Sequence, residues 1–282
     1  MALLHPQCAH ISPKVLPPVA MESEPTEIAV GGDTSIRWTT EWLYDYAVLV
    51  ALVVARVVVS QTAGTWLGWT VTPGDPTYNK PQVGDLIPSW GNALLSIEGP
   101  ALLMPLVLIA MIATIRRREA VYAPLFVMDV HNAWLGLLTA YLSTSCVTAA
   151  LKAALGQPKP SFFAAIAAGG GDDARHSFPS GHASVAAMGY TYLAWYVAGH
   201  CGVWRPRGTG QPTPLVWFLV IGAIVAAPII VAVTRIRDYS HFPLDVTVGL
   251  LIGGVISSFT YRFHWRWPWQ AGADLPLTYS RK

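Results

Sequence analysis

The chain contains few charged residues. Asp, Glu, Lys and Arg make up 12% of its 282 residues, whereas a soluble domain usually carries about 25%. Together with 53% hydrophobic residues and a mean hydropathy of +0.42, this deficit predicts an integral membrane protein. The net charge of +2 is too small to indicate a nucleic-acid partner.

Cysteine is also scarce. The three cysteines, Cys8, Cys146 and Cys201, are far apart and odd in number, which indicates neither a disulfide framework nor a metal cluster. The first forty residues contain no continuous apolar segment, so we expect no cleavable signal peptide. In that case the first membrane span would act as the signal anchor.

Long apolar stretches, by contrast, are frequent. A helix needs about 20 mostly apolar residues to cross the hydrocarbon core of a bilayer. The sequence predicts six such spans, at Trp42–Ser60, Ala93–Thr114, Ala133–Ala150, Ala183–Val197, Leu215–Val233 and Leu244–Tyr261. We therefore predict an all-α fold, a bundle of six membrane-spanning helices.

Six spans place both termini on one side of the membrane. That side holds more Lys and Arg than the other, so the positive-inside rule makes it cytoplasmic. The prediction divides the chain into a cytoplasmic N-terminal tail (residues 1–40), a six-span domain (41–262) and a cytoplasmic C-terminal tail (263–282). Most basic residues of the opposite side lie in two connections, those after the third and fifth spans. Membrane topology does not explain this clustering, whereas a bound ligand would.

Two of these cations are Lys152 and Lys159, in the sequence KAALGQPKP that follows the third span. Gly156 and Pro158 should end the helix, so that Lys152 lies near its end and Lys159 lies on the following loop. Lysines at a membrane interface often do no more than extend toward the headgroups, and for the pair alone this is the simpler interpretation.

The segment RHSFPSGHAS, residues 175–184, precedes the fourth span. Pro179 can stand just before a helix, and Ser180 is a typical N-cap. Gly181 and His182 then occupy the first turn. Free N–H groups and the helix dipole attract anions at such a helix start, and Gly181 leaves room for a ligand. The alternative is a helix cap with no further role.

The segment TRIRDYSHFPLDV, residues 234–246, leads into the sixth span. His241 and Asp245 are four residues apart, and Pro243 is tolerated in the first turn of a helix. The Asp245 carboxylate could accept one imidazole N–H and leave the other nitrogen as a nucleophile. Arg235 adds a guanidinium suited to phosphate. Alternatively, His241 and Asp245 only cap the helix and meet solvent.

All three segments are predicted at the same face of the membrane. Together they offer three cations, a helix N-terminus, two histidines and one orienting carboxylate, which are the groups that in-line phosphoryl transfer needs. The sequence shows neither a carboxylate cage for Mg²⁺ nor a zinc triad, so we expect chemistry without a metal or other cofactor.

The order of these motifs resembles the signature of the type 2 phosphatidic acid phosphatase superfamily. The chain reads Lys152-x₆-Lys159-Pro160, then Pro179-Ser180-Gly181-His182, then Thr234-Arg235-x₅-His241-x₃-Asp245. The segments DVHNAWLGL, PKPSFF and DPTYNKP are similar to the eukaryotic lipid phosphate phosphatases in particular. The resemblance extends over most of the chain, from the first predicted span to the end of the sixth.

The resemblance implies a role for each matching residue. His241 would attack phosphorus and become a phosphohistidine, Asp245 would orient it, and His182 would protonate the leaving oxygen. The phosphoryl oxygens would be held by Lys152, Lys159, Ser180, the N–H of Gly181, and Arg235. No residue is implied as a metal ligand.

Two positions depart from the family pattern. Lys159 stands in place of an arginine, which keeps the charge but loses the planar fork that binds two phosphate oxygens. Thr234 stands in place of a serine and keeps the hydroxyl. These departures bear on phosphate affinity and on substrate range.

We therefore expect a Mg²⁺-independent phosphatase that hydrolyses phosphatidate, lysophosphatidate, diacylglycerol pyrophosphate or sphingoid-base phosphates. Its active site is expected at the extracytoplasmic ends of the helices, in a secretory-system membrane (endoplasmic reticulum, vacuole or plasma membrane). The expected partners are the lipid substrate and the bilayer, without nucleic acid, and a homo-oligomer is left open. The alternatives are transfer of a lipid headgroup, as in sphingomyelin synthases, and a catalytically weakened, lipid-binding pseudoenzyme.

Overall fold

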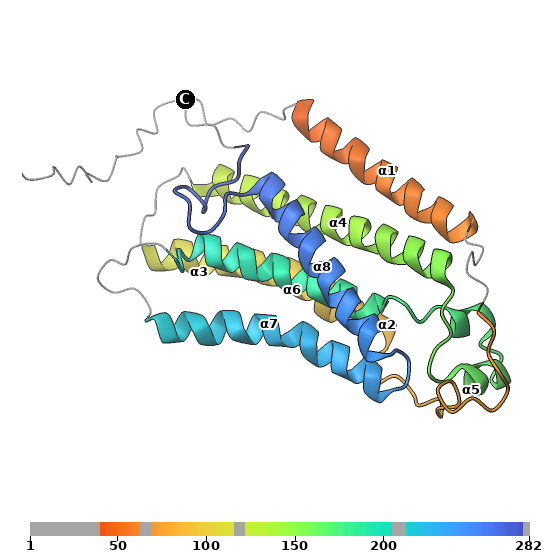
Figure 1. The fold of residues 1–282 in the computed structure, drawn as a ribbon. Coiled ribbons are helices and arrows are strands. Elements are labelled where there is room, and N and C mark those ends of the chain that lie inside the picture. The colour runs from red at the N-terminus through yellow and green to blue at the C-terminus, as the bar shows by residue number, and fades with distance from the viewer. Residues whose placement is uncertain (1–39, 63–68, 116–121, 205–212, 279–282) are drawn as a thin grey trace, which may run out of the picture. The chain divides into compact units, whose positions relative to one another are not determined.

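The structure is a computed structural model that describes residues 40–62, 69–115, 122–204 and 213–278, all within the unit Thr34–Lys282 of the chain (Figure 1). Its elements are helical: α1 (Thr40–Thr62), α2 (Ser89–Ala93), the π-helical turn η1 (Leu94–Glu98), α3 (Gly99–Ile115), α4 (Tyr122–Leu155), α5 (Phe162–Ala167), the 3₁₀ turn η2 (Gly171–Arg175), α6 (Gly181–His200), α7 (Pro214–Arg237) and α8 (Pro243–His264). The described residues form no β-strand, only one isolated bridge between Trp265 and Pro276. The all-α prediction is confirmed.

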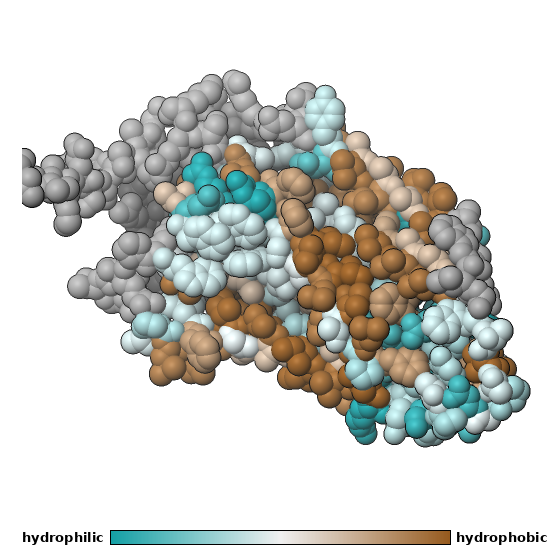
Figure 2. All heavy atoms as spheres, in the orientation of Figure 1, coloured by the Kyte–Doolittle hydropathy of each residue, from teal (hydrophilic) through white to brown (hydrophobic). Residues whose placement is uncertain are grey.

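Five helical segments of the described residues are long and apolar enough to cross a membrane. They are Trp42–Gln61, Ser89–Ala113, Leu125–Leu155, Pro214–Arg237 and Pro243–His264. Many large apolar side chains of α1, α3, α7 and α8 are exposed, and Figure 2 shows hydrophobic residues over much of the visible face. Water would not tolerate apolar surface on this scale, whereas lipid chains would cover it. The chain is an integral membrane protein.

Helix α6 contains the remaining predicted span, Ala183–Val197, but is not among these five segments. It packs against α3, α4, α7 and α8, and fourteen of its twenty residues are buried. A helix surrounded by other helices does not need a lipid-facing apolar surface. This explains why α6 can carry polar residues such as Ser184, Tyr192 and His200 in its interior contacts.

Glycines bring the backbones of neighbouring helices close together. A Cβ atom added to Gly253 of α8 would lie 2.0 Å from the carbonyl oxygen of Ser184 in α6. One added to Gly189 of α6 would lie 1.6 Å from the carbonyl oxygen of Ser96 in η1. Small residues of this kind allow tight packing of membrane helices. The α6–α8 contact therefore depends on the absence of a side chain at Gly253.

The residues after α8 do not leave the bundle as the expected C-terminal tail suggests. Trp265 and Ala273 are fully buried, and the N–H of Leu277 donates to the carbonyl oxygen of His264 at 2.9 Å. The ring of Trp265 packs edge-on against Tyr196 of α6, with 5.5 Å between centroids. Residues 265–278 thus fold back onto the ends of α6 and α8.

Two adjacent glycines allow a matched test of the α6–α8 contact. We predict that Gly253→Ala lowers the free energy of unfolding by about 1–3 kcal/mol, because the added methyl meets backbone atoms that cannot move aside. Gly254→Ala is the control, since its Cβ would meet only the Thr191 hydroxyl, at 3.8 Å. Thermal unfolding in detergent micelles measures both, and equal stability of the two variants would contradict the prediction.

Candidate active site

The three segments singled out in the sequence lie together at one end of the bundle. They are the end of α4 with the loop that follows, the start of α6, and the connection between α7 and α8. Hydrogen bonds join them: the N–H of Ser180 donates to the carbonyl oxygen of Asp245 at 3.0 Å, and the N–H of Ser177 donates to that of Gln157 at 2.9 Å. The structure thus brings residues from three distant parts of the sequence into one site.

The two lysines contact the segment that precedes α6. Lys152 is in the last turn of α4, and its Nζ donates to the carbonyl oxygen of His176. The Nζ of Lys159 forms an ion pair with Asp173. Partial burial raises the pKa of Asp173, but the hydrogen bond and charge of Lys159 outweigh it and hold that pKa below its ordinary value. Asp173 therefore stays ionised at neutral pH.

The N-terminus of α6 has the form that the sequence predicts. Ser180 is the N-cap, and its hydroxyl accepts a hydrogen bond from the N–H of Ala183 at 3.4 Å. A Cβ added to Gly181 would meet only the Cε of Lys152, at 3.9 Å, so the backbone is open toward that lysine. The Nε2 of His182 is buried and has no hydrogen-bond partner among the described residues. Free backbone donors, a cation and an unpaired imidazole nitrogen are suited to a bound anion.

His241 lies beside Asp245, as the four-residue spacing predicts. Its Nδ1 is 3.8 Å from the Asp245 carboxylate, longer than a hydrogen bond. That carboxylate is fully buried and is fixed by the N–H of Phe242 at 2.9 Å and by the hydroxyl of Ser177. Burial lowers the pKa of His241 and outweighs the opposing effect of Asp245. The imidazole is therefore neutral at pH 7, with Asp245 facing one of its two nitrogens.

Arg235 is fully buried and held by three partners. Its Nη1 is 3.1 Å from Asp85, its Nη2 is 2.8 Å from Asp238, and its Nε donates to the hydroxyl of Thr234 at 3.3 Å. A guanidinium has five N–H groups, so one remains on each terminal nitrogen. Arg235 can therefore offer a pair of donors to a phosphate while its plane stays fixed.

Residues 69–88, which we call the strap, connect the first and third segments. Main-chain hydrogen bonds run from the N–H of Lys80 to the carbonyl oxygen of Pro160 (3.1 Å) and from the N–H of Phe163 to that of Tyr78 (3.3 Å). The N–H of Leu86 donates to the Asp238 carboxylate at 3.0 Å. The strap carries Asp85 to the guanidinium of Arg235.

The sequence analysis missed four acidic or hydroxyl residues of this site: Asp85, Asp173, Ser177 and Asp238. Asp238 follows Arg235 by three residues, a helical spacing that could have signalled a pair. Asp85 gave no such signal, because 150 residues separate it from Arg235. Among the described residues, no group of three or more His, Cys, Asp or Glu side chains could hold a metal ion.

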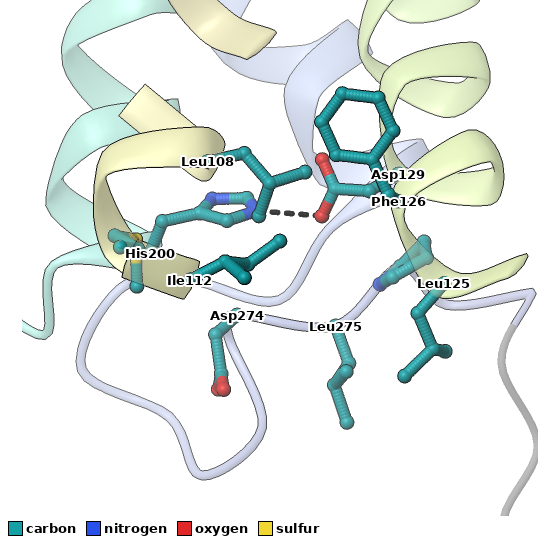
Figure 3. Close-up of a pocket in the computed structure, with 10 residues that line it drawn as sticks. Leu108, Ile112, Leu125, Phe126, Asp129, His200, Asp274 and Leu275 are labelled. Atoms are coloured by element: carbon teal, nitrogen blue, oxygen red, sulfur yellow. Dashed lines mark hydrogen bonds and ion pairs between the residues drawn. The ribbon is translucent and has the colours of Figure 1, made fainter. Parts of the chain in front are cut away.

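A cavity of about 130 Å³, separate from this site, lies among α3, α4, α6 and the folded C-terminal residues (Figure 3). None of the predicted site residues lines it. Its polar lining residues are Asp129, His200 and Asp274. Asp129 is 2.8 Å from the Nε2 of His200 and accepts a hydrogen bond from the hydroxyl of Tyr196. Because these groups bond to one another, the pair stabilises the packing of α4 against α6.

Comparisons with known proteins find similarity over the part of the chain that holds this site. A model of the PAP2 superfamily matches residues 133–269, a range that includes all three segments. Over this range the chain is similar to the PAP2 superfamily. The family resemblance seen in the sequence is thereby confirmed.

Three named relatives, two from a plant and one from a fission yeast, illustrate the similarity. The chain is 28% identical over 262 residues to the "Probable lipid phosphate phosphatase 4" of Arabidopsis thaliana, covering 86% of this chain and 78% of that protein. It is 29% identical over 213 residues to "Lipid phosphate phosphatase 1" of the same plant, covering 69% and 60%. It is also 27% identical over 150 residues to the "Probable diacylglycerol pyrophosphate phosphatase 1" of Schizosaccharomyces pombe, covering 45% and 52%. No solved structure gives a significant match.

The contact between Asp85 and Arg235 predicts an effect on anion affinity. We expect Asp85→Asn to tighten the binding of inorganic phosphate about two- to fivefold, because it removes a partly exposed negative charge beside the guanidinium but keeps an oxygen acceptor. Titration calorimetry in micelles measures the Kd. Asp75→Asn is the control, because Asp75 is on the same strap but its side chain accepts a hydrogen bond from the N–H of Thr77 (2.8 Å) and forms no ion pair with a described residue. Weaker phosphate binding by Asp85→Asn would show that the charge holds Arg235 rather than competing with the ligand.

Proposed function

We propose that the protein is a membrane phosphatase that removes phosphate from lipid phosphates. The match to the PAP2 superfamily supports a phosphatase, and the names of the plant and yeast relatives support a lipid phosphate as its substrate. Phosphatidate, lysophosphatidate, diacylglycerol pyrophosphate and sphingoid-base phosphates fit the proposal. In each of them the acyl or alkyl chains can stay in the bilayer while the phosphate reaches the site.

The observation that carries this proposal is the buried, neutral His241 with Asp245 at its Nδ1 side. Neutral imidazole is a nucleophile, and a carboxylate at Nδ1 leaves Nε2 free to react. Nε2 would attack the phosphorus, forming a P–N bond while the bond from phosphorus to the lipid oxygen breaks. His182, whose Nε2 is unpaired, would give its proton to that leaving oxygen.

A second step would restore the enzyme. His182, now without its proton, would accept one from a water molecule that attacks the phosphorus. The P–N bond would then break, releasing inorganic phosphate and neutral His241. Lys152, Lys159 and Arg235 would hold the equatorial oxygens in both steps, with Ser180 and the N–H of Gly181 at the helix start.

The proposed membrane topology has six crossings, formed by the five long apolar segments and by α6, which is the fourth crossing in chain order. In this arrangement the site lies at the extracytoplasmic ends of the helices and both termini are cytoplasmic. The distribution of Lys and Arg supports it. The termini and connections on the side opposite the site carry more basic residues than the connections on the side of the site. The membrane would be one of the secretory system.

Phosphate release from phosphatidate in micelles with EDTA present tests the proposal. We predict that the wild type releases phosphate and that His241→Ala loses activity by about 10³-fold or more, because no other group replaces the nucleophile. His176→Ala is the matched control, since its contact with Lys152 uses the backbone oxygen and survives the change. Undiminished turnover by a folded His241→Ala protein would exclude His241 as the nucleophile.

The pKa of His241 predicts a pH dependence. Only the neutral imidazole attacks, and burial lowers the pKa of His241 below the ordinary 6.5. Activity should therefore persist as the pH falls below 6.5 and disappear only as it passes through the lowered pKa. The measurement is kcat/KM against pH for two substrates whose phosphate groups differ in their second pKa. The fall in kcat/KM at low pH that both substrates share reflects the enzyme. If its midpoint lay at or above pH 6.5, the assignment of a neutral His241 as the nucleophile would be refuted.

A further inference from the structure

A groove of about 520 Å³ runs along α8, away from the proposed active site. Four of its lining residues, Leu250, Gly254, Ser258 and Arg262, follow one another at intervals of four and so lie on one face of the helix. Trp267 closes one end of the lining. Hydrophobic residues cover α8 in the face that Figure 2 shows.

The length of this groove corresponds to one leaflet of a bilayer. From Leu250 to Arg262 the helix rises by about 18 Å, and half of a hydrocarbon core is about 15 Å. Asp245, in the proposed active site, lies seventeen residues before Arg262 on the same helix, or about 25 Å away. The Arg262 end of the groove is therefore at the opposite end of α8 from the phosphate site.

The floor of the groove is hollow and effectively apolar. A Cβ added to Gly254 would meet only the Thr191 hydroxyl, at 3.8 Å. The hydroxyl of Ser258 donates to the carbonyl oxygen of Gly254 at 2.8 Å and accepts from the Nε1 of Trp195 at 3.0 Å. Because its hydrogen bonds are made within the protein, this surface has little to offer water. A hydrocarbon chain fits it.

The end of the groove is cationic. The Nη1 of Arg262 donates to the carbonyl oxygen of Trp265 at 3.3 Å, and no carboxylate among the described residues pairs with this guanidinium. Trp267 stacks on Trp269, with 5.3 Å between ring centroids and 6° between planes. Tryptophans and arginines at the end of a span are typical of the headgroup layer. This end would meet the phosphate of a phospholipid.

We propose that this groove is a lipid-binding site for one anionic phospholipid, with an acyl chain along Gly254 and the headgroup phosphate on Arg262. Charge complementarity at Arg262 favours an anionic headgroup over a neutral one. The site is independent of the catalytic proposal, because none of the phosphatase residues lines it. The lipid stabilises the folded protein, since it binds a surface that exists only in the fold.

Phosphatidylglycerol is a suitable probe, because it is anionic but is a phosphodiester. The full chain is reconstituted in nanodiscs of phosphatidylcholine with increasing fractions of phosphatidylglycerol, and Tm is measured for each. For the wild type we expect a saturable rise in Tm. Arg262→Gln should weaken the apparent affinity about tenfold, as expected for loss of a hydrogen bond to a charged group. Gly254→Leu, which fills the groove, should abolish the saturable rise.

Arg266→Gln is the control, because Arg266 is exposed, lies four residues further on and bonds only to the carbonyl oxygen of Ala271. It removes the same charge and should leave the response unchanged. Equal responses of Arg262→Gln and Arg266→Gln would overturn the proposal in favour of a general surface-charge effect. A wild-type Tm that is the same in phosphatidylcholine and in phosphatidylglycerol would also overturn it. So would a change in the number of protein chains per nanodisc in Gly254→Leu. Tm in pure phosphatidylcholine verifies that each variant folds.

Discussion

The close contact between α6 and α8 sets the geometry of the site. Gly249 and Gly253 of α8 have no side chains, so the main-chain atoms of Ser180 and Ser184 in α6 can pack directly against them. One turn further on, the N–H of Ser180 bonds to the carbonyl oxygen of Asp245. The two helix starts are thereby fixed to each other. Because both proposed reacting histidines lie at these helix starts, their separation is determined by main-chain packing rather than by flexible side chains.

Two of the three cations of the candidate site are paired with carboxylates before any substrate arrives. Lys159 pairs with Asp173, and Arg235 pairs with both Asp85 and Asp238. Burying a guanidinium without such partners would be costly. Of these carboxylates, Asp238 is fully buried, Asp85 is partly exposed and Asp173 is largely exposed. The inner pair holds the cation in place, and the outer carboxylates meet the region that an incoming anion must enter.

Much of this could be predicted from the sequence, because helix spans and short motifs depend on local pattern. The apolar stretches predicted the helices, and the spacing of His241 and Asp245 predicted their proximity. The contacts of Asp85 and Asp173 could not be predicted, since they depend on how the strap and η2 fold over distant segments. The C-terminal residues were expected as a tail, but apolar aromatic side chains such as Trp265 pack into the bundle. Hydropathy also did not reveal that α6 is the innermost helix.

The manner in which the strap is attached has a consequence for how the protein can diversify. Its bonds to the loop after α4 are made by main-chain atoms of Tyr78 and Lys80, so they do not depend on the side chains at those positions. Elsewhere a side chain also holds the strap, since the indole of Trp69 donates to the carbonyl oxygen of Leu155 at 2.7 Å. Asp85 differs from Tyr78 and Lys80, because it acts through its side chain, which pairs with the buried guanidinium of Arg235. A single codon change there would alter how the candidate site meets an anion while the proposed nucleophile and its support remain as they are, which gives natural selection a narrow means of tuning ligand preference.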